Sequence, residues 1–195
     1  MKIYFTASLT GKKYYEENYK KIVSYLKEFG HKVIAEHILH GSKEKVLKET
    51  REEKLVYLKW LNKRIKKCDV MIAEVSYPST SVGYEISLAM EKGKPVIAMY
   101  SEKGGDCPLV IKGLGETTKE EELMLLRYNF KNLKEVLKEN IDFIKARSLN
   151  KRFTMLLSPK IVGYLDKIFK NEKIPRSVYI RKLIEEDMEK RGQKR

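Results

Sequence analysis

Two kinds of hydrophobic pattern alternate along the chain. Short apolar runs predict buried strands, and longer segments in which apolar residues recur every three or four positions predict amphipathic helices. The predicted strands are residues 2–5, 32–35, 70–75, 94–100 and 123–127. The predicted helices are residues 15–29, 49–68 and 82–92, followed by one that Asn132 caps. This alternation predicts an α/β fold, a Rossmann- or flavodoxin-like, mostly parallel sheet flanked by helices.

The stretch from Asp69 to Glu85 links the third predicted strand to a helix through a turn rich in Ser and Pro. In parallel sheets, ligands bind beyond the carboxyl ends of the strands, where the next helix offers free N–H groups and a positive dipole end. Glu85, near the start of that helix, is therefore our first candidate for chemistry. The alternative is a first-turn acid favoured by the dipole, which is worth about 0.3–1 kcal/mol. We expect Asp69 to cap or terminate the preceding helix.

The pattern changes after residue 148. Residues 151–158 predict a short strand, and two short helices follow, the first opening at Pro159 and the second ending near Met188. One strand and two short helices cannot bury a core alone, so we expect this segment to dimerise. The predicted organisation is an α/β domain at 1–127, a closing helix and linker at 128–148, and a small module at 149–195.

Positive charge is concentrated in the C-terminal module. The 195-residue chain has a formal charge of +14, and residues 149–195 contain 13 Lys and Arg against 6 Asp and Glu. Such density suits a phosphate-rich partner. The alternative is a solvated, thermophile-like surface, because the whole chain is rich in Lys and Glu.

Cysteine usage and hydropathy narrow the class of protein. Cys68 and Cys107 are too few for a disulfide framework and lack metal-site spacing, so we expect both to be reduced and structural. No apolar run approaches the roughly 20 residues of a membrane span, and no signal segment opens the chain. We therefore expect a cytoplasmic protein without a membrane partner.

The predicted α/β domain contains blocks of a known family. The blocks are Ile3-Tyr4-Phe5 followed by Ser8 and Gly11, then Glu36-His37, then Asp69-Val70, Ala73-Glu74-Val75, Pro78-Ser79 and Val82-Gly83-Tyr84-Glu85. In these the chain resembles the nucleoside 2-deoxyribosyltransferase family, which includes 2′-deoxynucleoside 5′-monophosphate N-glycosidases. The resemblance implies that Glu85 is the catalytic carboxylate, which attacks the anomeric carbon while the base leaves.

The same resemblance implies a nucleoside or nucleotide site and no metal or redox cofactor. The implied substrate-binding residues are Ser8, Gly11, His37, Ser79, Ser81 and Gly83. For Ser79 and Ser81, a plain helix-capping role is the alternative. For His37 and Tyr4, the alternative is that they are packed residues that bind no substrate.

Three positions depart from the family pattern. Leu61 stands where the family places an Asp that orients the carboxylate or helps to protonate the leaving base, and its loss could cost about 10²–10⁴-fold unless it is replaced. Thr10 replaces an Arg of the monophosphate-specific members, and Ser81 replaces a Gly. Lys12 and Lys13 are candidates to supply the lost charge.

Residues 151–188 resemble a ribbon-helix-helix domain of the CopG type. The resemblance implies that two chains pair their strands into a ribbon that enters the DNA major groove. Because side chains alternate along a strand, Phe153 and Met155 would face the core, while Arg152 and Thr154 would read base edges. The alternative is a ribbon used only for dimerisation.

Three functional hypotheses follow from these patterns. The first is an enzyme that cleaves N-glycosidic bonds or transfers deoxyribosyl groups, dimerised or further oligomerised by its ribbon-helix-helix tail. The second is a DNA-binding regulator whose N-terminal domain senses a nucleotide without catalysis, and the loss of the acid at Leu61 favours it. The third is an interaction protein in which neither site works.

Overall fold

A computed structural model describes residues 1–104, 106–118, 122–148, 155–172 and 176–192. The chain divides into two compact units, residues 1–150 and 151–195. Each unit is described by itself.

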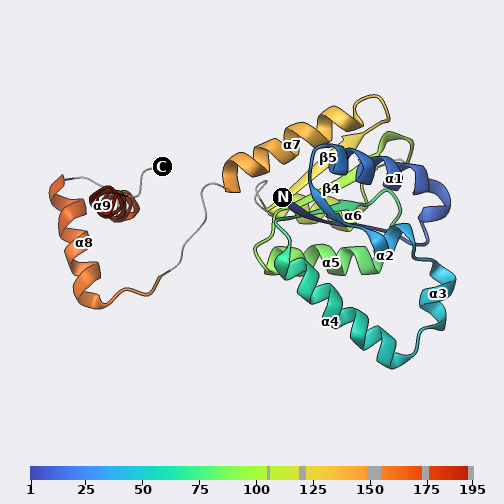
Figure 1. Ribbon diagram of the computed structural model, residues 1–195, viewed down its shortest axis with the longest axis horizontal. Helices are drawn as coiled ribbons and strands as arrows, with labels where there is room; N and C mark the ends of the chain where they lie inside the picture. Colours follow the sequence, from blue (N-terminus) through green and yellow to red (C-terminus); the bar gives the residue numbers. More distant parts are fainter. Residues whose placement is uncertain (105, 119–121, 149–154, 173–175, 193–195) are drawn as a thin grey trace. The chain divides into compact units, whose positions relative to one another are not determined.

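The first unit is built on a five-stranded sheet in which every neighbouring pair of strands is parallel (Figure 1). The strands are β1 (Lys2–Ala7), β2 (Lys32–Ile34), β3 (Val70–Glu74), β4 (Val96–Ser101) and β5 (Leu123–Tyr128). Their order in the sheet is β2-β1-β3-β4-β5. All strands therefore end at one edge of the sheet, and β1 and β3 end side by side in its centre.

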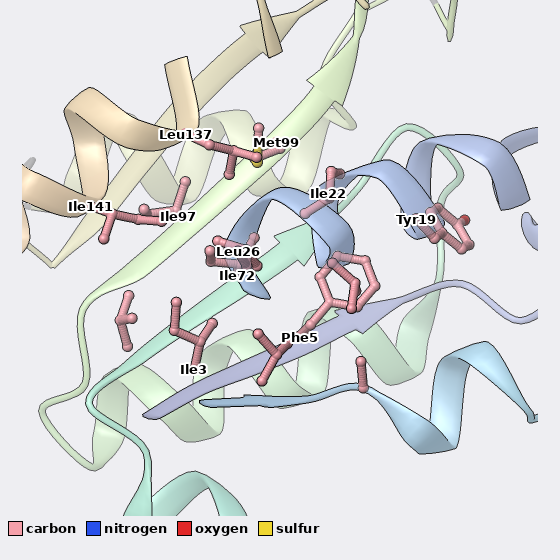
Figure 2. Packing of buried hydrophobic residues seen from close by; sticks show 14 of the residues in the cluster. Ile3, Phe5, Tyr19, Ile22, Leu26, Ile72, Ile97, Met99, Leu137 and Ile141 are labelled. Carbon is pink, nitrogen blue, oxygen red and sulfur yellow. The ribbon is translucent and has the colours of Figure 1, made fainter. Parts of the chain in front are cut away.

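Helices cover both faces of this sheet. They are α1 (Lys12–Glu28), α2 (Glu36–Leu39), α3 (Lys43–Lys48), α4 (Arg51–Lys67), α5 (Thr80–Glu91), α6 (Leu109–Thr117) and α7 (Leu133–Ser148). The helices α1 and α7 pack on one face, and Figure 2 shows Ile22 and Leu26 of α1 and Leu137 and Ile141 of α7 in that layer. The helices α4, α5 and α6 pack on the other face. The predicted α/β class is confirmed.

Side-chain alternation along β1 and β3 divides the buried residues between the two layers. Ile3 and Phe5 of β1 lie in the layer of α1 and α7, and Tyr4 between them lies in the layer of α4 and α5. In β3, Ile72 faces α1 and α7, whereas Ala73 faces α4 and α5. This alternation directs Tyr4 towards the helix that carries Glu85.

Local signals place the ends of several helices. Thr50 and Glu53 form a capping box at the start of α4, in which each side chain accepts a hydrogen bond from the other's backbone N–H. Gly30 and Gly93 follow α1 and α5 with φ of +78° and +63°, a conformation that side chains disfavour. These signals lie within a few residues of each other in sequence, so the sequence alone predicts them.

Two local predictions differ from the structure. The helix α6 was not predicted, because its pattern is weak: only Ile111 is buried, and Gly113 and Gly115 interrupt it. Asp69 does not cap α4. Its Oδ2 accepts a hydrogen bond from Lys2 N at 2.6 Å, so it joins the start of β1 to the start of β3.

The described residues of the second unit form two helices, α8 (Pro159–Glu172) and α9 (Arg176–Lys190). Of the strand predicted at 151–158, residues 151–154 lie outside the described residues, and residues 155–158 have no regular structure in the single chain. A strand requires a hydrogen-bonded neighbour, and the prediction placed that neighbour in a second copy. In the described part of the chain, no helix combines the length and the apolar character needed to cross a membrane.

Candidate active site

Glu85 lies in the second turn of α5, the helix that begins just beyond the carboxyl end of β3. Ser79 caps this helix, with Oγ accepting a hydrogen bond from Val82 N at 3.5 Å. The Glu85 side chain points to the inner face of α5 and is only 4% exposed. An acid buried this deeply needs polar partners, because desolvation disfavours its charged form.

Tyr4 contacts Glu85, and His37 contacts Tyr4. The Tyr4 hydroxyl donates to Glu85 Oε2 at 3.1 Å and lies 2.9 Å from His37 Nε2. Because the hydroxyl proton goes to Glu85, His37 Nε2 carries a proton and donates to Tyr4, which leaves His37 Nδ1 unprotonated. That Nδ1 is buried and has no hydrogen-bond partner in the described part of the chain. The hydrogen bonds therefore run in one direction, from His37 to Tyr4 and from Tyr4 to Glu85. The Nδ1 atom of His37 is left as a free acceptor.

Burial sets the protonation of this cluster. Desolvation raises the pKa of Glu85 to about 7, and the neighbouring Thr6 and Tyr4 hydroxyls limit the rise. Burial lowers the pKa of His37 to about 4, so His37 is neutral near pH 7. Burial and the charge of Glu85 both raise the pKa of Tyr4. Near neutral pH, Glu85 is thus poised between its two forms beside a neutral tyrosine and a neutral histidine.

An aromatic wall from α4 borders this cluster and was missed in the sequence. Trp60 packs edge-on to His37, with ring centroids 5.3 Å apart, and Tyr57 stacks on Trp60 at 5.7 Å. Burial, and next the charge of Glu85, raise the pKa of Tyr57. The sequence signal that could have revealed this wall is the spacing of three residues between Tyr57 and Trp60, which places both rings on one side of a heavily charged helix.

Leu61, next to Trp60, is the residue at which the resemblance led us to expect an acid. Its side chain is 1% exposed and packs with Ile65 and Ile86 in the apolar layer between α4, α5 and the sheet. This position therefore contributes packing and no proton donor or acceptor.

The loop after β1 lies against the loop after β3. Ser8 Oγ accepts from Gly11 N at 3.0 Å, and Ser8 O accepts from the Tyr19 hydroxyl at 3.2 Å, so Ser8 is buried and braces its own loop. A Cβ at Gly11 would collide with Tyr77 Cβ and would lie 2.9 Å from the Tyr19 hydroxyl. Gly11 is thus required for the close approach of the two loops.

The other predicted site residues are placed as follows. Ser81 is exposed in the first turn of α5 and lies four residues before Glu85, on the same side of the helix. Gly83 has open space around its Cα. Lys12 Nζ donates to Leu39 O at 2.7 Å and to Gly41 O at 3.0 Å, so this cation holds the end of α2.

Arg152 and Thr154, the predicted base readers, lie outside the described residues. Within the described ranges, no group of three or more His, Cys, Asp or Glu side chains is arranged to hold a metal ion. Cys68 and Cys107 are both buried free thiols.

Comparison with known proteins identifies relatives. Residues 3–124 match the family described as nucleoside 2-deoxyribosyltransferase. The 5-hydroxymethyl-dUMP N-hydrolase of Rattus norvegicus is 33% identical over 104 residues, which cover 53% of this chain and 63% of the rat protein. A putative 2′-deoxynucleoside 5′-phosphate N-hydrolase 1 of Methanosarcina mazei is 32% identical over 145 residues, which cover 74% of this chain and 84% of that protein.

Among solved structures, the Clostridium botulinum CMP N-glycosidase BcmB is similar, with a TM-score of 0.47 and 22% identity over 71% of this chain and 98% of that chain. The rat relative is an N-hydrolase of a nucleotide, and the family match covers more than half of the sequence. The chain belongs to the nucleoside 2-deoxyribosyltransferase family.

Proposed function

We propose that the chain cleaves the N-glycosidic bond of a 2′-deoxynucleotide or deoxynucleoside, with Glu85 as the nucleophile. The observation that carries the proposal is the buried carboxylate of Glu85, held by the Tyr4 hydroxyl beyond the carboxyl end of β3. A carboxylate in this position suits a transition state with positive charge on the sugar, because a negative oxygen below C1′ stabilises that charge.

The reaction has two steps. A Glu85 oxygen bonds to C1′ while the C1′–N bond breaks and its electron pair leaves with the base. Water, or a second base, then attacks C1′ and releases the Glu85 carboxylate, and the proton that the attacking molecule loses passes to the departed base anion. Attack by water gives the free sugar or sugar phosphate, and attack by a base gives a new nucleoside. The Tyr4 hydroxyl orients the reacting carboxylate in both steps.

The missing acid favours a base that leaves as an anion. Leu61 cannot donate a proton, His37 is neutral near pH 7, and the pKa of Tyr4 is raised. A uracil-type base can depart unprotonated, because the charge on its N1 is delocalised over two carbonyl groups, whereas purines and cytosine leave more readily once protonated. The rat relative, a 5-hydroxymethyl-dUMP N-hydrolase, also acts on a uracil-type base. We therefore propose uracil-type deoxynucleotides as the preferred substrates.

The first turn of α5 suits the phosphate of such a substrate. The N-terminus of a helix offers free N–H groups and a partial positive charge to an anion. Ser81 is exposed there, and the loop that contains Ser8 and Gly11 packs against the preceding residues. We propose that the first turn of α5 and the loop after β1, together with Gly83 and the free Nδ1 of His37, bind the nucleotide.

The test is base release measured by chromatography. The purified chain is incubated with 5-hydroxymethyl-dUMP, dUMP, dCMP and dAMP and the corresponding nucleosides, beside the Glu85→Gln variant, which keeps the side-chain size and removes the charge. We expect release that is fastest from the uracil-type substrates and lost in the variant. Equal release by both proteins would refute Glu85 as the nucleophile, and faster release from dAMP would refute the preference for anionic leaving groups.

A second proposal concerns the C-terminal unit, residues 151–195: we propose that it dimerises the protein. Apolar side chains of its two helices are exposed in the single chain, with Ile161 47%, Phe169 50% and Ile184 56% exposed. Leaving such side chains in water costs free energy that a second copy can recover.

The DNA-binding regulator remains the alternative function. Binding of duplex DNA that weakens steeply with salt, and that weakens on Arg152→Ala, would support it.

A further inference from the structure

A cavity of about 210 Å³ lies away from Glu85, on the face of the sheet that α1 and α7 cover. Its walls come from the first turns of α1 and from the segments that follow β4 and β5. Three aromatic rings, Tyr14, Tyr15 and Phe130, line it together with three neutral polar side chains, Asn18, Ser101 and Asn129. Glu85 and its partners lie in the opposite layer, so this cavity is separate from the candidate active site.

The floor of the cavity is fixed by a buried polar network. Asn18 Nδ2 donates to the Tyr128 hydroxyl at 2.9 Å, and that hydroxyl donates to Glu74 Oε1 at 3.0 Å. Ser76 Oγ donates to the same Glu74 oxygen and accepts from Ser101 N at 2.8 Å. A network in which both wall residues, Asn18 and Ser101, are held in place presents a preorganised polar surface.

The chemistry of the lining selects the class of ligand. Lys103 and Glu17 also line the cavity, and the Glu17 carboxylate is paired with Lys21 at 3.0 Å. The other six lining residues are neutral, which favours an uncharged, planar ligand. Asn18 Nδ2 donates to Tyr128, which leaves its Oδ1 and one N–H for a ligand. Asn129 Oδ1 accepts from Lys131 N and Asn132 N and its Nδ2 donates to Glu102, which leaves one N–H, and the aromatic rings offer stacking surfaces. The volume is below the roughly 300–1,000 Å³ of sites for drug-sized ligands. It suits a single planar heterocycle better than a whole nucleotide.

We propose that this cavity is a second binding site, specific for a free nucleobase. A nucleobase is uncharged, planar and carries adjacent donors and acceptors on one edge, which matches the rings and amides of the lining. The binding claim does not depend on catalysis by Glu85. Under the proposed reaction a free base is also the leaving product, so the site would respond to product.

The structure links this cavity to the active-site loop. Tyr14, in the cavity wall, stacks on Tyr77 with ring centroids 5.9 Å apart and planes 13° apart. Tyr77 belongs to the loop between β3 and α5, two residues before the Ser79 cap of the helix that carries Glu85. A base in the cavity therefore contacts a side chain that packs directly on this loop.

The test is a titration of the full-length Glu85→Gln protein, labelled with ¹⁵N, with uracil, cytosine and adenine, followed by the backbone amide signals. We expect saturable shifts at residues 18, 101 and 129–130 for at least one base. The variant Tyr15→Ala, which removes a ring from the wall, should weaken that binding at least tenfold. Lys131→Ala, an exposed change outside the cavity lining, should leave it unchanged, and the amide spectrum of each variant reports whether it is folded.

Two outcomes would overturn the proposal. One is the absence of saturable shifts at these residues with any of the three bases at millimolar concentration. The other is binding that shifts only residues around Glu85, or that Tyr15→Ala leaves unchanged. Neither outcome bears on the nucleophile, because the titration uses the variant that cannot form the sugar ester.

Discussion

Replacing Tyr4 with Phe removes one hydroxyl and leaves the ring in place. That hydroxyl donates to Glu85 Oε2 at 3.1 Å in a site where the carboxylate is 4% exposed. A hydrogen bond to a charged group is worth about 1.5–3 kcal/mol, which corresponds to a pKa change of roughly 1–2 units. The pKa of Glu85, already raised to about 7 by burial, should therefore rise further in the variant.

The predicted consequence is a shifted pH profile. The nucleophile must be the carboxylate, so kcat/KM for base release rises with pH through the pKa of Glu85. With that pKa moved up by 1–2 units, the carboxylate fraction at pH 7 falls from about one half to about 1–9%, a loss of roughly five- to fiftyfold in rate. Raising the pH above 9 should restore most of the lost activity.

The matched control is Tyr19→Phe, which also removes a buried hydroxyl. That hydroxyl donates to Ser8 O at 3.2 Å and makes no contact with Glu85. The profile of this variant should keep the midpoint of the wild type. If Tyr4→Phe keeps the wild-type midpoint, or if both variants shift it equally, the assigned role of Tyr4 is wrong.

Three further predictions follow from the structure. Gly11→Ala should lower the free energy of unfolding by about 1–3 kcal/mol in urea titrations, because the added Cβ would collide with Tyr77. Gly83→Ala should raise the free energy of unfolding by about 0.5–1 kcal/mol, because the added Cβ would lie in open space and Ala favours a helix more than Gly does. Unfolding titrations that rank the two variants in the reverse order would contradict this close approach. Burial raises the pKa of Glu74 to about 7, so the folded state loses stability as pH rises from about 4.5 through 7. In urea titrations at several pH values, Glu74→Gln should reduce this pH dependence. An unchanged pH slope of the free energy of unfolding would refute the raised pKa of Glu74. Ile184→Glu should convert a dimer to a monomer in light scattering, with Lys182→Glu, another exposed position of α9, as the control; a wild-type monomer would dismiss the dimerisation proposal.

The strands, the parallel sheet and the position of Glu85 were predictable because each depends on local pattern. Apolar runs of strand length separate amphipathic helices, and a helix that follows a strand in such a fold begins at the ligand-binding edge. The family blocks led to the proposed role of Glu85, which the pattern alone left open between catalysis and a dipole-stabilised helix acid. The family itself is confirmed by the match over residues 3–124.

The missed features depend on contacts between residues far apart in the sequence. In the sequence, Glu74 is one residue of a predicted buried strand, and its hydrogen-bond partner Tyr128 lies 54 residues later. Trp60 and Tyr57 lie on a helix whose other residues are mostly charged, and only the folded chain brings them to His37 and Tyr4. Asp69 was expected to cap or terminate α4, which ends at Lys67 with Cys68 as its cap residue, yet its side chain accepts from the backbone of Lys2. In each case the local sequence offers several partners and the tertiary structure selects one.

Trapping of the covalent intermediate tests the central claim most directly. A 2′-fluoro-arabino analogue of dUMP slows breakdown of the sugar ester, because fluorine destabilises positive charge at C1′. Intact-protein mass spectrometry should then show one added sugar phosphate per chain, peptide mapping should locate it on Glu85, and Glu85→Gln should show none. Base release from the natural nucleotide without any adduct, or an adduct on a different residue, would contradict the assignment of Glu85 as the nucleophile.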